Sequence, residues 1–350
     1  MVQSLAAQND VLGWQVKNGY RQADNQYYWK NRLPTPGYWQ QDVHYKIRAR
    51  LDDTAERIDG RMELVYWNNS PDTLREVFFH LYQNAFQPGS YLSDLYASNK
   101  TKPEWGKYEA QKLGTRVNSI ACSRPGDLMQ VRMQLTPRLD NTIMQVSLPA
   151  NFKLAPGDSL RFHIEFNTWF DRGSVRRRMK VYDVDSGYKH FNTVHWYPRI
   201  SVYDRKFGWD VQQHMEHEFY GDFGTFDVEL DLPAHYVTEA TGTLLNPEQV
   251  YKDGWREKID MSNFKTPEQA AKAPLLLANP RERRFWRWHA ENVHDFAWTS
   301  DPTYRVMEVK WNDISCIAIA EQQHAPNWQP TAEFVAFVVR TYSSDFGRYA

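Results

Sequence analysis

The clearest structural signal in this 350-residue chain is Thr225-Phe226-Asp227-Val228-Glu229-Leu230-Asp231-Leu232. Apolar and acidic side chains alternate here without a break, so on an extended backbone the two sets point to opposite faces. Pro233 follows and lacks the N–H that a β-ladder needs, which predicts the end of the segment. The stretch therefore predicts a half-buried β-strand.

The same period of two recurs on both sides of this strand. It predicts further strands at residues 43–48, 62–66, 76–82, 116–122, 128–135, 142–148, 159–166, 281–288, 304–311 and 314–320. Residues 52–60 are expected to connect the first two of these strands, residues 88–105 to form a polar loop, and residues 252–260 to form a hairpin. We therefore predict a mainly β fold built from several sheets.

Helical composition is found only toward the C-terminal part of the chain. Residues 266–279 have it, and a second helix is expected to begin at Pro330-Thr331 and to end before Gly347. The apolar side chains that recur at helical spacing in the second helix are Phe334, Phe337, Val338 and Tyr342. At the other end, residues 1–40 show no clear period and are predicted to form an arm on the folded body.

The composition narrows the class of protein. Lys and Arg number 42 against 43 Asp and Glu, and this balance argues against a nucleic-acid binder. Apolar residues make up 41% and charged residues 24%, which argues against a disordered chain. No apolar run approaches the ~18 residues of a membrane helix. Aromatic residues make up 15%, and such side chains favour wide β surfaces.

The cysteines and the N-terminus give two smaller expectations. Cys122 and Cys316 are too few for a disulfide scaffold or a four-cysteine zinc site, and two separate thiols are favoured over a single bridge. Residues 1–8 lack the apolar segment of a signal peptide, but their small side chains are typical of the end of one. An extracytoplasmic location follows if this segment is such a remnant.

A zinc-binding helix is not found in the sequence. His-Glu-x-x-His, which places two imidazoles on one helix face, is absent, and the nearest run is His214-Met215-Glu216-His217-Glu218. On a strand, His214, Glu216 and Glu218 would share one face and could hold a metal ion. A solvated polar face near a strand edge is the favoured interpretation.

Three other polar patterns are interpreted as structural or stay open. His289, His294 and Asp295 form a cluster whose favoured use is structural hydrogen bonding, because neighbours on a strand point to opposite faces. The basic run Arg176–Arg178 is interpreted as a solvated loop. Neither a Gly-x-Ser-x-Gly elbow nor a phosphate loop is present. A carboxylate pair for glycoside cleavage stays open, since no two carboxylates stand out.

Three segments together resemble one known family. The first is the stretch 141–149, which runs on to Pro156-Gly157-Asp158. The second contains, in this order, His195-Trp196-Tyr197-Pro198-Arg199, Gly208-Trp209, Glu218-Phe219-Tyr220 and Thr241-Gly242. The third is the stretch 291–298, Glu-Asn-Val-His-Asp-Phe-Ala-Trp. The combination is similar to the N-terminal domain of the aminopeptidase N-type zinc metallopeptidases, the gluzincins, over roughly residues 40–350.

The resemblance implies a domain organisation. It implies an arm at 1–40, a saddle-shaped multi-sheet β domain at 41–300, and at 301–350 the first strands and helix of a thermolysin-like catalytic domain, truncated before the zinc motif. The family's Gly-x-Met-Glu-Asn strand and zinc helix are absent from the sequence. No catalytic or metal-binding residue is therefore expected in this chain, and zinc is expected in the intact enzyme.

The resemblance also implies substrate-binding residues. In the family, a residue beside the Trp-Tyr-Pro element faces the substrate amine, and His195 occupies the matching position. A neutral imidazole accepts a hydrogen bond from an amine, while packing is the alternative role. Tyr197 and Arg199 are further candidates. The expected partner of the intact enzyme is a peptide substrate, with no nucleic acid and no membrane span.

Three functions stay open at this point. The first is the N-terminal portion of an aminopeptidase-like zinc metallopeptidase, which removes N-terminal residues from peptides as an intact enzyme and is inactive as this chain alone. The second is a stand-alone β-rich protein that binds peptides or glycans without catalysis, and the third is a glycoside hydrolase. The first function expects Phe334, Phe337 and Val338 to be partly exposed, whereas the second expects them to be buried.

Overall fold

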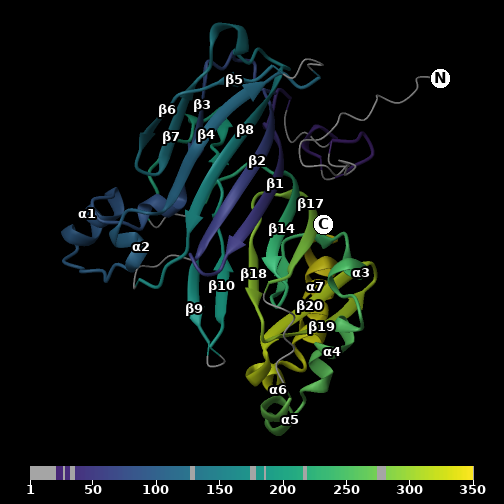
Figure 1. The fold of residues 1–350 in the computed structure, drawn as a ribbon. Coiled ribbons are helices and arrows are strands. Elements are labelled where there is room, and N and C mark those ends of the chain that lie inside the picture. Colours follow the sequence, from purple (N-terminus) through teal and green to yellow (C-terminus); the bar gives the residue numbers. More distant parts are fainter. Residues whose placement is uncertain are drawn as a thin grey trace.

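Strands dominate the structure of this chain. The computed structural model describes residues 21–26, 28–31, 36–126, 131–173, 179–184, 187–215, 219–273 and 281–349. In these residues the strands form one eight-stranded sheet, two four-stranded sheets and two two-stranded sheets (Figure 1). The mainly β, multi-sheet fold class that the alternating segments predict is confirmed, while the saddle shape and the division into domains stay predictions.

The largest sheet has the strand order β16-β17-β14-β1-β2-β8-β4-β5. The bounds of its strands are β1 Asp42–Asp52, β2 Arg57–Trp67, β4 Thr115–Ser123, β5 Met133–Gln134, β8 Ser159–Trp169, β14 Gly224–Pro233, β16 Thr243–Leu244 and β17 Arg283–Val293. At its centre, β1 pairs antiparallel with β2 and parallel with β14. The parallel pair joins two parts of the chain that are far apart in sequence.

The apolar face of β14 packs into the main core. Phe226, Val228 and Leu230 are at most 1% exposed, and they share this core with Tyr45 and Ile47 of β1. The rings of Tyr45 and Phe226 stack at 4.7 Å between centroids. Each such side chain contributes about 2 kcal/mol to folding by leaving water. The strict alternation in the sequence thus reflects a sheet with one buried apolar face.

The other face of β14 carries a row of carboxylates between two rows of basic side chains. The acidic row is Asp227, Glu229 and Asp231, and the basic rows are Lys46, Arg48 and Arg50 on β1 and Arg287 and His289 on β17. Glu229, for example, lies 2.6 Å from Arg48 and 3.0 Å from Arg287. Because each carboxylate is paired, the desolvation of this polar face is compensated.

Four smaller sheets complete the β structure. The first has the order β15-β18-β10-β9, with β9 Lys180–Asp183, β10 Lys189–Thr193, β15 Val237–Ala240 and β18 Trp298–Asp301. The second has the order β11-β3-β7-β6, with β3 Glu76–His80, β6 Pro137–Asp140, β7 Ile143–Ser147 and β11 Arg199–Ile200. The two-stranded sheets are β12 Tyr203–Asp204 with β13 Gly208–Trp209, and β19 Tyr304–Trp311 with β20 Ile314–Glu321.

Helices are few and mostly short. The α-helices are α1 Tyr91–Ser98, α2 Lys107–Ala110, α3 Pro247–Val250, α4 Trp255–Lys258, α5 Pro267–Lys272, α6 Ala325–Trp328 and α7 Thr331–Phe346. The 3-10 helices are η1 Trp29–Asn31, η2 Tyr82–Ala85, η3 Ala150–Phe152, η4 Met261–Asn263 and η5 Gln322–His324. The longest, α7, packs against the β19–β20 hairpin (Figure 1). In the part of the chain that the structure describes, no helix is long and apolar enough to cross a membrane.

Two local predictions are wrong because side-chain packing outweighs the sequence pattern. Residues 252–260 contain the short helix α4 at 255–258 rather than a hairpin. Gly254 adopts a positive φ of 68° that turns the chain into the helix, and Ile259, just after it, is buried against β19. Residues 88–105 contain α1 rather than only a loop. The Ser90 side chain accepts a hydrogen bond from the Ser93 N–H at its start, and Leu92 is fully buried.

Other boundaries differ more modestly. The connection predicted at 52–60 is shorter, because Arg57 to Gly60 belong to β2, where a Cβ on Gly60 would lie 2.2 Å from the Phe166 ring. Of the predicted strand at 128–135, the described residues show only the two-residue strand β5, and residues 127–130 lie outside the described part. The predicted helix at 266–279 is α5, with residues 274–280 likewise outside it. The C-terminal strands and helix are confirmed as β19, β20 and α7.

The charged face of the large sheet predicts a loss of stability at alkaline pH. His289 Nδ1 lies 2.6 Å from Asp227 and its Nε2 lies 3.1 Å from Glu291. Burial opposes the charge of His289, but these two carboxylates raise its pKa to about 9. A raised histidine pKa stabilises the fold fully below about pH 6.5, and this contribution is lost as the pH rises through about 9.

We therefore expect His289→Gln to remove up to about 3 kcal/mol of stability at pH 6 and much less at pH 10, as measured by urea unfolding. The control is His324→Gln, because the His324 side chain is 58% exposed. A loss that is equal at both pH values would show that His289 contributes by packing rather than by its charge.

Candidate functional site

The Trp-Tyr-Pro segment lies between β10 and β11 and is anchored in the core. Trp196 is fully buried, and its indole Nε1 donates a hydrogen bond of 2.9 Å to the carbonyl of Phe296. The Thr168 hydroxyl donates to the carbonyl of Trp196 at 2.8 Å. The segment is thus fixed to β8 and to the β17–β18 connection, two distant parts of the sequence.

His195 stands in this segment with an uncommon backbone conformation. Its φ is 53°, in the left-handed region that non-glycine residues rarely adopt. The Gln83 side-chain amide donates to the carbonyls of Val194 and His195, both at 3.0 Å. Strain of this kind persists where surrounding contacts enforce it, and it is often found at functional sites.

The carboxylate of Asp295 organises the side chains of this segment. It accepts hydrogen bonds from the Tyr197 hydroxyl at 2.7 Å and from the Phe296 N–H at 2.8 Å, and it lies 3.0 Å from His195 Nδ1. Burial opposes its ionisation, but His195, Arg199 and Tyr197 outweigh burial and hold the pKa of Asp295 well below its usual value. Asp295 is therefore a largely but not fully buried anion, with 16% of its side chain exposed.

Arg199 adds a buried cation to the same cluster. Its side chain is 3% exposed and lies in the electrostatic field of Tyr82, Tyr197 and Asp295. The backbone of Gly221 lies against it, since a Cβ on Gly221 would fall 1.2 Å from Arg199 Nη2. Only glycine leaves room for the guanidinium at this position.

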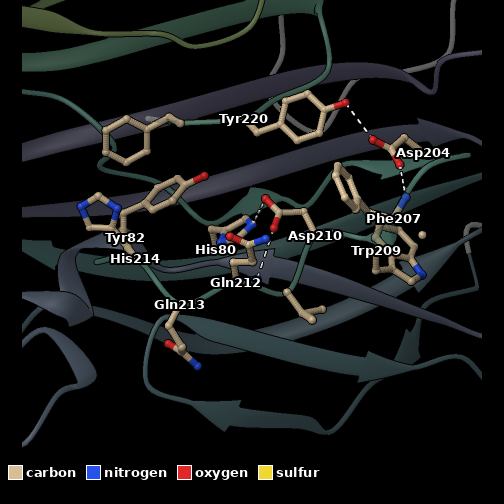
Figure 2. A pocket seen from close by; sticks show the side chains of 13 residues that line it. His80, Tyr82, Asp204, Phe207, Trp209, Asp210, Gln212, Gln213, His214 and Tyr220 are labelled. Carbon is tan, nitrogen blue, oxygen red and sulfur yellow. Dashed lines mark hydrogen bonds and ion pairs between the residues drawn. The ribbon is translucent and has the colours of Figure 1, made fainter. Parts of the chain in front are cut away.

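A pocket of about 330 Å³ opens next to this cluster (Figure 2). It is built where β3, η2, β12 and β13 meet the segments 210–214 and 219–220. Its lining residues are His80, Tyr82, Asp204, Phe207, Gly208, Trp209, Asp210, Val211, Gln212, Gln213, His214, Phe219 and Tyr220. Aromatic and acidic side chains predominate among them.

Two carboxylates give the pocket its negative charge. Asp210 lies 3.5 Å from His80 Nε2 and accepts a hydrogen bond from the Gln212 N–H at 3.2 Å. Burial opposes its ionisation, but His80 and Arg199 help to lower the pKa of Asp210, so it stays ionised. Asp204 accepts a hydrogen bond from the Tyr220 hydroxyl at 2.9 Å. Such carboxylates suit a cationic ligand group.

Aromatic rings connect the pocket to the Trp-Tyr-Pro segment. Tyr82 stacks on His80 with centroids 4.9 Å apart and meets Phe219 edge-on at 4.7 Å. Phe219 in turn stacks on the His195 ring at 3.5 Å. Burial raises the pKa of Tyr82 to about 12, so its hydroxyl stays neutral. The Tyr82 and Phe219 rings of the pocket lining are therefore in contact with the His195 ring behind them.

The three substrate-binding residues expected from the sequence lie together. His195, Tyr197 and Arg199 are 7%, 1% and 3% exposed and converge on Asp295. They form a layer behind the pocket lining rather than the lining itself. Their contact with a substrate stays a prediction.

Other residues singled out in the sequence have mixed outcomes. His289 and Asp295 make structural hydrogen bonds, as predicted, while His294 lies against the Phe223 ring. His214 lines the pocket, and Glu216 and Glu218 lie outside the described residues, as do residues 1–8 and 176–178. Cys122 and Cys316 are separate buried thiols, as favoured.

Sequence reasoning missed Tyr82 and Asp210. Tyr82 begins η2 two residues after β3 ends, and Asp210 follows the Gly208-Trp209 pair that the family resemblance includes. The sequence therefore gave a hint only for Asp210, through its place next to Gly208-Trp209. Tyr82 and Asp210 both contact His80, whose position depends on its pairing with Arg199 across β3 and β11. Local sequence does not reveal this pairing.

A zinc site of the kind that the resemblance implies does not fit the residues present. Within the described ranges, the one group of three His, Cys, Asp or Glu ligand atoms close enough to share an ion is His190, Asp301 and Glu321. These residues come from three strands rather than from one helix. No step of zinc-dependent hydrolysis is assigned to this chain.

Comparisons with known proteins give structural neighbours only. No family model and no curated protein matches the sequence. Among solved structures, a point mutant of the M1 zinc metallopeptidase from Deinococcus radiodurans bound to a Tyr-Ser-Ala substrate is similar, with a TM-score of 0.47 and 13% identity over 89% of this chain and 54% of that one.

Two further structures of the M1 zinc metallopeptidase give similar values. The Deinococcus radiodurans enzyme without a named mutation has a TM-score of 0.43 at 13% identity, and a two-domain mutant bound to L-tryptophan has 0.41 at 12%. Each match covers 91% of this chain and 56% of the other. The chain thus spans just over half the length of the structures it matches.

The buried Asp295 cluster predicts a large effect of a small substitution. Asp295→Asn keeps the shape of the side chain but removes the negative charge that Arg199 and His195 face. We expect a loss of about 3 kcal/mol in the free energy of unfolding, because one partner of a buried charge cluster is removed.

Asp313→Asn is the matched control, because the Asp313–Arg348 pair is 69% and 61% exposed, and we expect a change within about 0.5 kcal/mol. Urea unfolding measures both variants. Equal effects of the two substitutions would contradict the role assigned to Asp295.

Proposed function

We propose that this chain is the N-terminal, β-built portion of an aminopeptidase-like zinc metallopeptidase. In the intact enzyme it would form one wall of the cleft from which N-terminal residues of peptides are hydrolysed. The division into an arm at 1–40, a β domain at 41–300 and the start of a catalytic domain at 301–350 belongs to this proposal. The observation that carries it is the ionised Asp210 within an aromatic pocket beside the Trp-Tyr-Pro segment.

The pocket suits the amino-terminal end of a peptide. A free α-amino group is a cation at neutral pH, and Asp210 and Asp204 supply carboxylate acceptors for it. Tyr82 and Trp209 add aromatic faces that attract a cation. Phe207 is 64% exposed and offers an apolar surface for a substrate side chain. An uncharged ligand would gain less from this combination.

The layer behind the pocket supports this recognition. In the proposal, Arg199 and Asp295 hold Tyr197 and the neighbouring Tyr82 in place, so they act as positioning residues. His195 is proposed to face the amine in the intact enzyme, and among the described residues no hydrogen-bond partner reaches its Nε2 atom. A contact between this atom and a ligand would require Phe219, which stacks on the ring, to shift.

Zinc belongs to the remainder of the intact enzyme in this proposal. There it would activate a water molecule for attack on the peptide carbonyl. The exposed face of α7 is consistent with contact to further polypeptide, since Phe334 and Phe337 are 63% and 51% exposed and Val338 is partly exposed. This exposure is what the first function expects and differs from the burial expected for a stand-alone protein.

The alternative is a stand-alone β-rich protein that binds peptides or glycans. A groove of about 1,050 Å³ favours it, because Trp39 and Tyr203 line this groove and stack on each other at 5.7 Å. Exposed aromatic faces of this kind also suit sugar rings. The ligand class that binds the chain therefore separates the two functions.

The first prediction from the proposed function concerns catalysis. We expect the purified chain to show no hydrolysis of amino-acid p-nitroanilides above the buffer rate, with or without added Zn²⁺, because the zinc helix is not in its sequence. Release of p-nitroaniline is followed by absorbance. Zinc-dependent turnover by the purified chain would overturn this part of the proposal.

The second prediction concerns the ligand class. Titration with a dipeptide that has a free amine should shift the Trp209 indole signal in ¹⁵N-labelled protein, and the N-acetylated dipeptide should bind about tenfold more weakly, which is about 1.4 kcal/mol. A neutral oligosaccharide that binds more tightly than either dipeptide would favour the alternative function and contradict the proposal.

A further inference from the structure

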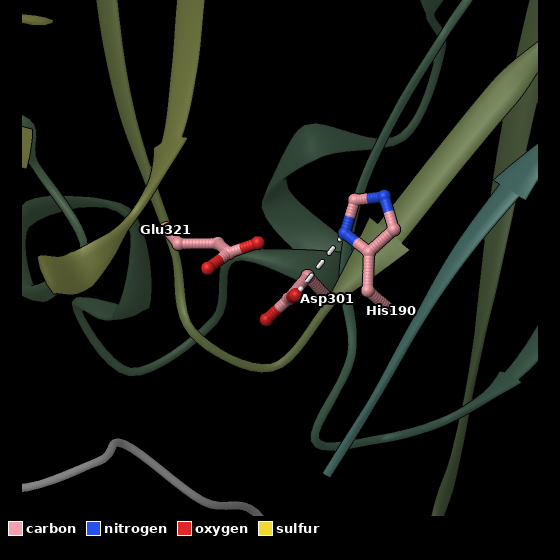
Figure 3. Close-up of side chains that lie close together, drawn as sticks. All are labelled: His190, Asp301 and Glu321. Carbon is pink, nitrogen blue, oxygen red and sulfur yellow. Dashed lines mark hydrogen bonds and ion pairs between the residues drawn. The ribbon is translucent and has the colours of Figure 1, made fainter. Parts of the chain in front are cut away.

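Three side chains of metal-ligating type meet on strands and in sheets that do not line the pocket. They are His190 on β10, Asp301 at the end of β18 and Glu321 at the end of β20 (Figure 3). One ligand atom from each lies within 4.8 Å of the other two. His190 Nδ1 lies 3.2 Å from Asp301 Oδ2.

The strand registers bring these residues together. Phe191 on β10 pairs with Ser300 on β18, so His190 and Asp301 are the next positions along the two strands. A short turn leads from Asp301 to Tyr304, which pairs with Glu321 across the β19–β20 hairpin. Each side chain is therefore held by an element whose position is fixed by backbone hydrogen bonds. Sites on such elements hold their geometry better than sites on loops.

Contacts around the cluster orient its ligands. Asp301 is fully buried, and its Oδ1 accepts hydrogen bonds from the Thr303 N–H at 2.6 Å and the Thr303 hydroxyl at 2.7 Å, which leaves Oδ2 facing His190. The Tyr304 hydroxyl lies 3.4 Å from His190 Nδ1 and 2.7 Å from the Thr299 hydroxyl. Outer contacts of this kind orient the ligands of known metal sites.

The charge balance of this cluster differs from that around Asp227. Asp227, for example, lies 2.6 Å from both His44 and His289, so one carboxylate faces two imidazoles. Here the ratio is reversed, because Asp301 and Glu321 face one imidazole. Two carboxylates in partly buried surroundings repel each other unless a cation lies between them.

Neighbouring cations in the described part of the chain do not fill this role. Arg305 is buried, but its guanidinium donates to the Tyr304 carbonyl at 2.7 Å and to the Gln322 side chain, and no ion pair joins it to either carboxylate in the described residues. His324 lies 3.9 Å from Glu321, but it is 58% exposed. Among the described residues, His190 is thus the basic side chain in close contact with Asp301, and the charge of Arg305 also acts on Asp301 without an ion pair.

We propose that His190, Asp301 and Glu321 bind a divalent cation of the Zn²⁺ or Mn²⁺ class. One imidazole nitrogen and two carboxylate oxygens are ligands that both ions accept. Ligands about 2.1 Å from such an ion lie about 3.0–3.4 Å from each other, which the His190–Asp301 separation already matches. The bound ion would link the β19–β20 hairpin to the β15-β18-β10-β9 sheet. Water molecules would occupy its remaining coordination positions.

This site is separate from the zinc of the proposed intact enzyme and does not depend on the proposed function. Its role is structural, since the ion joins two parts of the fold. The site can therefore be tested on this chain by binding and by stability, without any measurement of catalysis.

The test is calorimetric titration of the chelator-treated chain with Zn²⁺ and with Mn²⁺, together with thermal unfolding in each ion. We expect one saturable site for at least one ion and a Tm that rises with its concentration. Glu321→Gln should weaken binding by about tenfold or more and should abolish the rise in Tm. Because Glu321 lies partly exposed at a strand end, this variant is expected to fold.

The control variant is Glu308→Gln, since Glu308 lies on the same hairpin, is exposed and contacts Ser315 instead of the cluster. It should bind the ion as the unsubstituted chain does. The proposal is overturned if neither ion binds saturably at millimolar concentration, or if Glu321→Gln and Glu308→Gln bind equally. In both cases the His190–Asp301 contact is a simple hydrogen bond.

Discussion

The partly buried carboxylate of Asp295 is the group on which the candidate site depends. It holds Tyr197 and the Phe296 backbone by hydrogen bonds, lies 3.0 Å from His195 and offsets the buried charge of Arg199. A largely buried ion of this kind is stable because several protein groups solvate it at once. The same groups support Tyr82 and Phe219 in the pocket wall. The side chains that support the pocket, such as Trp196 and Tyr197, therefore belong to the main hydrophobic core.

The central sheet makes this arrangement possible. The parallel pairing of β1 with β14 joins distant segments and sets the position of β17, from which the connection with Asp295 follows. Its two faces are stabilised differently, one by apolar burial and one by a carboxylate row between basic rows. The polar face fixes the register, because a slip of one residue would place Asp227, Glu229 and Asp231 in the apolar core.

Local sequence was sufficient for the strands and insufficient for the pocket. The alternation at 225–232 predicted β14 because burial of one sheet face requires an apolar side chain at every second residue. The hairpin predicted at residues 252–260 was wrong, because burial of Ile259 against β19 favours the helix α4 there. The ion pair between Asp210 and His80 has no pattern in the sequence, since its two segments meet only in the folded chain. His190, Asp301 and Glu321 likewise meet only through strand pairing.

The central claim is that the pocket recognises a peptide amine through Asp210. A double-mutant cycle tests it most directly, with Asp210→Asn as one change and acetylation of the dipeptide amine as the other. The account predicts a coupling free energy of about 1 kcal/mol or more, so that acetylation no longer weakens binding once Asp210 is replaced. A coupling energy near zero, with acetylation equally harmful in both proteins, would contradict it.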